Sequence, residues 1–380
     1  MANKVIVFFG PDKAFEELVE SRSSRNENTV GYLDSIRIYN SRIRATELAS
    51  QGAKFAIPEE VDNCVVRAND FGSVLSHVIS NFATILEEAY DIGTLFIQNP
   101  PARALGSLRA AHPDEAIEEI FYEYEKVAKG DLPEIYSRLV NEVLGQAESK
   151  NTLISSLYKL SVMVDDHPSV ILLYGPSGIG KTETAKCVSE SLGGGLTRIQ
   201  FSMMQTNEAY DYLFGAEHSK ASFARDLLKR ESNVVLIDEF DKVQPVLYNM
   251  FYQLFDEGRF VDTNYDVDMR NALFLLTSNF STEKEAKRAM GTAMFSRISA
   301  CIRFEDLSVD DKIIIIKKKY DQVFEKLDQD DQKTIGSSGI LAWFIANAGR
   351  YDNMRTMKNK VEKAIFELLS NSIIKEAEEV

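Results

Sequence analysis

The sequence predicts an α/β protein whose centre is a doubly wound parallel sheet, with an N-terminal α/β accessory domain and a small C-terminal α-helical domain. Two patterns indicate this fold. Short apolar runs alternate with helical stretches between residues 170 and 277, and from Ser308 onward the pattern is wholly helical. Strands that alternate with helices form parallel sheets covered on both faces. The length of 380 residues also exceeds one average domain of roughly 150 residues.

The first domain boundary falls where Gly and Pro interrupt two helical patterns, at 129–133. We therefore expect three parts: an accessory, partner-binding domain over 1–130, a core over 131–305 and a helical lid over 306–380. In the first part we expect strands at Val5–Phe9, Lys54–Ile57, Cys64–Arg67 and Leu95–Gln98. We expect one helix there, at Phe71–Ala89. Asp114 resembles an N-cap with acidic first-turn residues after it, which predicts a helix start there.

The core and the lid have clearer periodicities. Residues 134–164 are helical with a break at Leu144–Gln146. The expected strands of the parallel sheet are Val170–Tyr174, Leu196–Phe201, Val234–Ile237 and Ala272–Thr277, and Cys301–Phe304 is a further apolar strand. A helix is expected at Lys181–Leu192, and the expected lid helices span 308–326, 339–348 and 354–377.

Composition limits the classes of function. The formal charge of -15 and the pI near 4.9 disfavour a protein that grips nucleic acid by a general basic surface. There is no apolar run of about 18 residues and no leader-like h-region, so we expect a cytoplasmic protein that does not associate with membranes. The three cysteines, Cys64, Cys187 and Cys301, lie far apart without metal-ligand spacing, which indicates buried free thiols.

A phosphate-binding loop follows the first core strand. The run Gly175-Pro176-Ser177-Gly178-Ile179-Gly180-Lys181-Thr182 fits the pattern GxxxxGK[ST] between a strand and a helix. Glycines let the backbone amides approach phosphate oxygens closely. Lys181 is expected to reach the β and γ phosphates, and the Thr182 hydroxyl to coordinate Mg²⁺. The sequence therefore predicts ATP and Mg²⁺ as ligands of this loop.

Two carboxylates come directly after the buried strand Val234–Ile237. Parallel sheets place their ligand crevice at the carboxyl ends of the strands, so Asp238 and Glu239 are expected to face the phosphate-binding loop. Asp238 suits the Mg²⁺ shell, and Glu239 suits a general base that orients and polarises water. Together with the loop they predict hydrolysis of ATP.

Four segments in order then resemble the ATPase core of the Clp-type AAA+ unfoldases, a lineage that torsins share. These segments are 236–243, 257–262, 269–271 and 277–279, and the resemblance covers roughly 134–372. It implies that Val143–Gln146 borders an adenine pocket. It also implies that Asn279 is the sensor-1 residue that helps to orient the attacking water, and that Arg355 is the sensor-2 arginine.

The same resemblance implies that Arg297 is an arginine finger, which acts on the nucleotide of a neighbouring subunit. We therefore expect a self-assembling homo-oligomer, as a hexamer-like ring or a filament, that acts on a protein substrate or effector. The sequence departs from the family in one respect. The stretch Leu213–Phe223 has no Tyr flanked by glycines, which is the pore-loop pattern that grips a threaded chain.

A second departure is the charged, helix-prone segment 281–293, which has no apolar loop of the Ile-Gly-Phe kind for docking a protease chamber. Two functions remain open on the sequence. One is an ATPase that remodels a protein partner. The other is a nucleotide-dependent oligomeric switch or scaffold that presents its N-terminal domain to an effector without threading substrate. DNA-linked work is disfavoured by the acidic balance.

Overall fold

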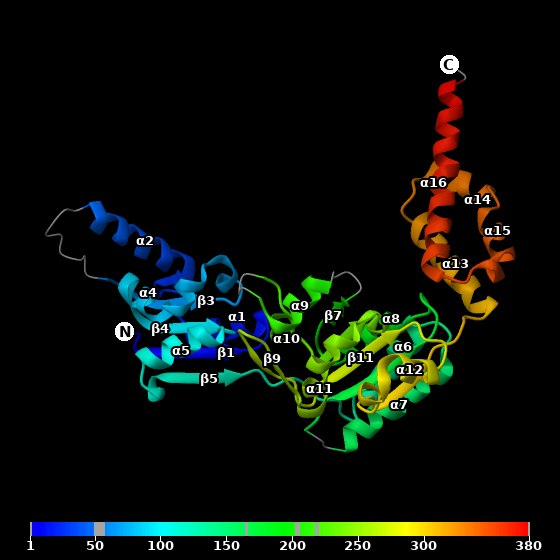
Figure 1. Cartoon of the computed structure of the whole chain (residues 1–380). Helices are drawn as coiled ribbons and strands as arrows, with labels where there is room; N and C mark the ends of the chain where they lie inside the picture. The colour runs from blue at the N-terminus through cyan, green and yellow to red at the C-terminus, as the bar shows by residue number, and fades with distance from the viewer. Residues whose placement is uncertain (1, 49–57, 164–165, 202–205, 217–219, 379–380) are drawn as a thin grey trace.

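The computed structural model describes residues 2–48, 58–163, 166–201, 206–216 and 220–378. Figure 1 shows an N-terminal sheet domain at one end, a central domain, and a helical lid that rises from the other end. Within the described ranges, no helix has the length and apolar character needed to cross a bilayer.

The N-terminal domain is a parallel sheet with strand order β2-β3-β4-β1-β5. Alternate residues of β1 face opposite sides: Val5 and Val7 pack with α2, α4 and α5, whereas Ile6 and Phe8 pack with α1. The sheet is therefore buried on both faces. The bounds of these elements are β1 (Lys4–Phe9), α1 (Asp12–Arg22), β2 (Thr29–Gly31), α2 (Tyr32–Leu48), β3 (Glu59–Val66), α4 (Phe82–Ala89), β4 (Tyr90–Gln98), α5 (Ala102–Ala111) and β5 (Ile117–Phe121).

The single helix predicted over Phe71–Ala89 is wrong. The segment forms a short 3₁₀ turn, η1 (Asp70–Ser73), then α3 (Ser76–Ser80) and α4, with extended backbone at Val74. The rings of Phe71 and Phe82 both pack on buried Tyr32, with centroids 6.0 and 5.1 Å away. We infer that this aromatic cluster outweighs the continuous helix that the periodicity favours.

The helix start predicted at Asp114 is also wrong. Residues Asp114–Ala116 make only a three-residue 3₁₀ turn, η2, and β5 follows at once, in parallel register with β1. The acidic side chains of this edge strand have partners outside it: Glu118 pairs with Lys4 and Arg22, and Glu119 pairs with Arg109. Tertiary pairing thus overrides the local cap signal. The strand expected at Lys54–Ile57 lies outside the described residues.

The core sheet is parallel, with order β12-β6-β11-β8-β7. Its central strands are buried along their whole length, in keeping with their continuous apolar sequences. One face packs on α6, α7 and α8, and the other on α9 to α12. The bounds are α6 (Leu132–Glu142), α7 (Ala147–Val162), β6 (Ser169–Tyr174), α8 (Lys181–Ser191), β7 (Thr197–Gln200), α9 (Thr206–Phe214), α10 (Phe223–Leu228), β8 (Val234–Asp238), η4 (Phe240–Lys242), η5 (Pro245–Leu247), α11 (Tyr248–Glu257), β11 (Leu273–Ser278), α12 (Glu283–Phe295) and β12 (Ala300–Arg303).

A small antiparallel hairpin, β9 (Arg259–Val261) and β10 (Asp266–Asp268), projects between α11 and β11. The sequence patterns gave no expectation for it. Its turn is held by Asp262, whose Oδ1 accepts hydrogen bonds from the backbone amides of Asn264 and Tyr265, at 2.7 Å each.

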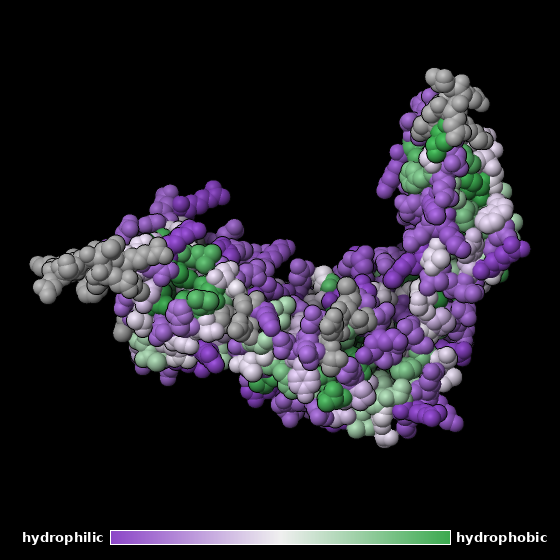
Figure 2. All heavy atoms as spheres, turned by 45° about the horizontal axis from the view of Figure 1, so that its top comes forward, coloured by the Kyte–Doolittle hydropathy of each residue, from purple (hydrophilic) through white to green (hydrophobic). Residues whose placement is uncertain are grey.

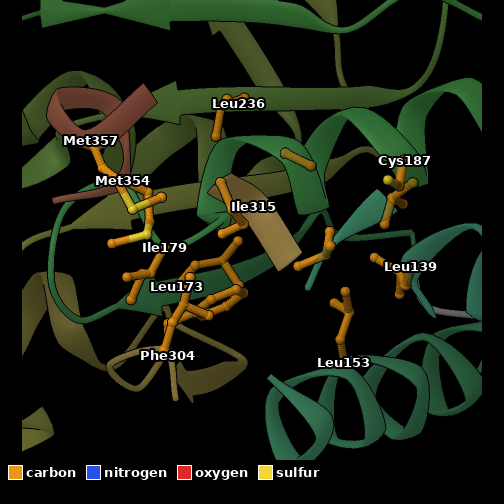
Figure 3. Close-up of a cluster of buried hydrophobic side chains, with 14 of the residues drawn as sticks. Leu139, Leu153, Leu173, Ile179, Cys187, Leu236, Phe304, Ile315, Met354 and Met357 are labelled. Atoms are coloured by element: carbon orange, nitrogen blue, oxygen red, sulfur yellow. The ribbon is translucent and has the colours of Figure 1, made fainter. Parts of the chain in front are cut away.

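The lid contains α13 (Val309–Phe324), α14 (Gln329–Ser337), α15 (Ile340–Ala346), η6 (Ala348–Arg350) and α16 (Met354–Glu378), which extends beyond the other lid helices (Figure 1). The sequence analysis missed α14, although Asp328 caps it by accepting from the amides of Asp330 and Asp331. Lid and core share one hydrophobic cluster: Figure 3 shows Ile315 and Met354 of the lid beside Ile179 of the loop before α8. The lid is therefore packed directly on the loop that precedes α8.

The N-terminal domain meets the core through the carboxyl ends of its strands. After β4, the Ala102 amide donates to the Asn264 carbonyl of the hairpin turn at 2.7 Å. After β3, Asn69 accepts from Lys229. After β5, the ring of Tyr124 lies under the Arg230 guanidinium, 3.9 Å from the ring centroid. The crevice where open parallel sheets usually bind ligands is thus occupied by the core.

Cys64 and Cys187 are buried and Cys301 is partly buried, all as free thiols. Burial raises the pKa of each thiol, to about 12 for Cys64 and Cys187 and to about 11 for Cys301. The prediction of buried free thiols is therefore confirmed for Cys64 and Cys187.

We predict that Arg230→Ala destabilises the protein. Arg230 is 5% exposed and donates to the carbonyls of Leu227 and Asp268, so its removal deletes two hydrogen bonds and the packing of a buried side chain. The free energy of unfolding should fall by about 2–4 kcal/mol in urea titrations. The exposed Arg288→Ala is the control and should change stability by less than about 0.5 kcal/mol. Equal stability of the two variants would contradict a stabilising role of the buried Arg230 side chain.

Candidate functional site

A pocket of about 720 Å³ opens where the parallel core strands end, between the core and the lid. Because the strands are parallel, side chains that follow several of them meet at this edge. The sequence-predicted site residues that line the pocket are Ser177, Gly178, Ile179, Gly180, Lys181, Thr182, Asp238, Glu239, Asn279 and Arg355. The structure therefore brings together residues that lie up to 178 positions apart in the chain.

The loop before α8 has a backbone that requires glycine. Gly175, Gly178 and Gly180 have positive φ angles of 136°, 80° and 106°. A Cβ atom at Gly175 would lie 2.2 Å from the Phe304 carbonyl oxygen. The loop ends at the amino terminus of α8, where unpaired amides and the helix dipole favour anions. This geometry fits a bound polyphosphate.

Lys181 lines the pocket and is 7% exposed. Its ammonium donates to the carbonyls of Gly175 at 2.5 Å and Pro176 at 2.7 Å, and it lies 3.5 Å from Asn279 Oδ1. Burial lowers the pKa of Lys181 from 10.5 to about 8, although the carboxylates of Asp241, Asp238 and Glu239 act in the opposite direction. A phosphate placed here would add negative charge beside the buried ammonium.

The two carboxylates at the carboxyl end of β8 are held by the flanking strands. Glu239 has left-handed backbone, with φ of 56°, and its amide donates to Thr277 Oγ1 at 2.9 Å. Its Oε2 accepts from Gln200 at 3.3 Å. Strained backbone of this kind is typical of functional sites. The Glu239 carboxylate therefore has a defined position at the edge of the pocket.

Asp238 is 6% exposed, and both of its oxygens accept hydrogen bonds. Oδ1 accepts from the Thr277 hydroxyl, and Oδ2 accepts from Arg198 Nε at 2.9 Å and Nη2 at 2.5 Å. Thr182 and Asp238 line the same pocket and offer hydroxyl and carboxylate oxygens, the donors that Mg²⁺ prefers beside water and phosphate. The residues present therefore fit Mg²⁺, which would neutralise phosphate charge when bound.

The far end of the pocket is apolar and lies against the lid. Val143, Leu144, Leu307, Ile315 and Met354 line it, as expected for the part that would hold a base. Gln146, two residues after Leu144, has left-handed backbone and exchanges hydrogen bonds of 2.7 and 3.0 Å with the backbone of Glu305. These bonds join the start of α7 to the segment that leads into the lid.

The lid supplies the remaining cations. Arg355 lines the pocket near the start of α16, where Asn353 accepts from the Arg355 amide at 2.9 Å and donates to Ser177 Oγ at 3.1 Å. Lys318, Lys319 and Lys358 also line the pocket, and the sequence analysis did not single them out. The lid side of the pocket is therefore strongly basic.

Arg297 does not line this pocket. Its Nη2 donates to Asp256 Oδ2 at 2.5 Å, its Nη1 donates to the Ala293 carbonyl at 2.6 Å, and its guanidinium lies 4.3 Å from the centroid of the Tyr252 ring. Within one chain, the structure thus separates Arg297 from the other predicted site residues.

Sequence reasoning missed Arg198, Gln200 and Thr277, which contact Asp238 or Glu239. One signal was available for the first two. Arg198 and Gln200 alternate with apolar Ile199 in a strand, so both side chains lie on one face of the sheet. Because β7 pairs with β8, with Gln200 opposite Asp238, they lie beside the carboxylates.

Residues 166–335 match the family described as "AAA domain (Cdc48 subfamily)". The chain is 23% identical to the chaperone protein ClpB of Malacoplasma penetrans, over 64% of this chain and 38% of the relative. It is 30% identical to the mitochondrial disaggregase of Homo sapiens, over 50% of this chain and 29% of the relative. It is 25% identical to the ATP-dependent Clp protease ATP-binding subunit ClpC of Staphylococcus epidermidis, over 80% of this chain and 40% of the relative. The chain therefore spans less than half the length of these curated relatives.

We predict that Lys181→Met stabilises the nucleotide-free protein by about 1–2 kcal/mol near pH 7, because it removes a poorly solvated charge. Between pH 8 and 10.5 the unfolded chain binds more protons at Lys181 than the folded protein does, so wild-type stability rises with pH there. The advantage of the variant should therefore be full below pH 8 and shrink above it. Urea titrations across this range measure it, and a pH-independent difference would contradict the burial of a charged Lys181.

Proposed function

Residues 166–335 form a Clp-type AAA+ ATPase domain, and we propose that the chain binds Mg-ATP in the pocket described above, hydrolyses it, and uses the cycle to remodel or regulate a protein partner. The observation that carries this proposal is the convergence of Lys181, Asp238, Glu239 and Asn279 on one pocket. These side chains lie at or beyond the carboxyl ends of three different core strands, β6, β8 and β11.

In the proposed reaction the phosphates lie on the loop 175–182, and Lys181 neutralises their charge. Glu239 accepts a proton from the attacking water, and Asn279 helps to orient that water. Arg355 is proposed to contact a phosphate group from the lid side through charge-assisted hydrogen bonds. Thr182 and Asp238 would hold Mg²⁺, which would supply further charge neutralisation when bound.

We propose that the chain assembles head to tail with copies of itself, as a ring or a filament. Arg297 lies outside its own chain's pocket, so a catalytic role requires the pocket of a neighbour. Figure 2 shows hydrophobic side chains reaching the surface of the lid, where the exposed large ones are Val309, Ile314, Trp343, Phe366 and Ile374. Exposed apolar side chains on a lid favour contact with another protein surface.

The partner is proposed to be a protein, because the relatives' names describe a chaperone, a disaggregase and a protease subunit. The alternative is a nucleotide-dependent switch that presents the N-terminal domain to an effector. The absence of a Tyr flanked by glycines in the sequence 213–223 favours it. ATP-driven unfolding of a tagged substrate by the assembled protein would exclude a pure switch, whereas ATP-dependent assembly without unfolding would favour it.

The first test is ATP turnover. Lys181→Ala should lose nucleotide binding, whereas Glu239→Gln should keep binding and lose turnover by about 10²–10⁴-fold, because only the base is removed. Binding is measured with a fluorescent ATP analogue and turnover by phosphate release. Undiminished turnover in both variants would refute the proposed reaction, and the exposed Arg288→Ala serves as the control.

The second test addresses the neighbour's arginine. Arg297→Ala alone should lower turnover by about 10³-fold. Mixing Arg297→Ala with Glu239→Gln should restore part of the activity, because some interfaces then combine an intact Glu239 with an intact Arg297 from the next subunit. Activity of the mixture equal to the sum of the separate variants would show that Arg297 does not act in trans.

A further inference from the structure

Arg198 is the nearest cation to Asp238 that the proposed reaction does not use. It donates two hydrogen bonds to Asp238 Oδ2, at 2.9 Å from Nε and 2.5 Å from Nη2. The Arg198 side chain is 43% exposed and lines the nucleotide pocket, whereas the Asp238 side chain is only 8% exposed. The contact therefore joins a partly exposed cation to a buried carboxylate.

The strands fix which carboxylate Arg198 can reach. In the parallel register of β7 and β8, Arg198 lies opposite Leu236 and Gln200 lies opposite Asp238. Gln200 donates to Glu239, so Arg198 and Gln200 each contact a different one of the two carboxylates. Arg198 thus acts on the carboxylate assigned to the metal rather than on the one assigned to the water.

Both oxygens of Asp238 already accept hydrogen bonds, because Oδ1 accepts from Thr277. A cation that binds Asp238, directly or through water, would therefore share an oxygen with Thr277 or with Arg198. A guanidinium left beside this carboxylate would also repel an arriving divalent cation, and more strongly so at a partly buried site. Arg198 and Mg²⁺ therefore compete for one carboxylate.

We propose, building on the function proposed above, that Arg198 is a positioning residue that neutralises Asp238 until Mg²⁺ takes its place. It pairs with the buried carboxylate and holds its orientation in the metal-free protein. It also removes a negative charge from the wall of the pocket, so that nucleotide can enter without metal. Binding of Mg²⁺ then requires release of Arg198, which raises the Mg²⁺ concentration that the site needs.

The test measures metal dependence rather than turnover. The full chain is titrated with a fluorescent ADP analogue in EDTA, and then with Mg²⁺ at a fixed concentration of the analogue. Arg198→Gln should bind the metal-free analogue more weakly and should need about tenfold less Mg²⁺ for half-maximal binding. Arg198→Lys keeps a charge without the two-pronged contact, so it should shift the Mg²⁺ midpoint in the same direction by less.

The control is Arg270→Gln, which removes an arginine with a comparable multiple contact to Asp268, outside the residues that line the pocket. It should leave both titrations unchanged. A Mg²⁺ midpoint in Arg198→Gln equal to or above that of the wild type would overturn the inference while leaving ATP binding intact. If Arg198→Gln does not fold, the midpoint of Arg198→Lys decides in the same way. A wild type that binds no analogue would overturn the proposed function and this inference together.

Discussion

The arrangement of the core depends on opposite charges buried at one edge of a parallel sheet. Lys181 and Asp238 are each less than 8% exposed, and each sits after or beside strands that are apolar along their length. Neither charge is fully solvated, so both are held by fixed partners: the carbonyls of the loop for Lys181, and Arg198 with Thr277 for Asp238. Burial of these charges costs free energy, and an anion bound beside Lys181 and a cation bound beside Asp238 would lower that cost.

The parts of the core that the sequence predicted best are those whose chemistry is local. Gly175 to Thr182 is a contiguous motif, and Asp238 and Glu239 follow a strand that is apolar throughout, so strand, loop and helix could be assigned without knowledge of distant contacts. The parallel fold then required these ends to meet. The lid helices α13, α15 and α16 followed from helical periodicity in the same way.

The features that sequence reasoning missed or misplaced depend on tertiary pairing. β5 exists because Ile117–Phe121 pairs with β1, and nothing next to it in the chain indicates that partner. We attribute the break in the helix predicted at Phe71–Ala89 to Tyr32, far earlier in the chain, whose ring packs against those of Phe71 and Phe82. Arg198 could be seen as polar in an apolar strand, but its contact with Asp238 depends on the register of two strands.

The docking of the N-terminal domain on the hairpin has a mechanical consequence. The Asn264 carbonyl, in the turn of the hairpin, accepts a hydrogen bond from the Ala102 amide. Along the chain, this turn lies between Glu239 and Asn279. Arg230, whose guanidinium lies over the Tyr124 ring, lies a few residues before the start of β8. The N-terminal domain is therefore joined to the segments on either side of the strand that ends in Asp238. A shift of that strand between nucleotide states would swing the whole domain as a lever, with its far end travelling further than the sheet edge that drives it.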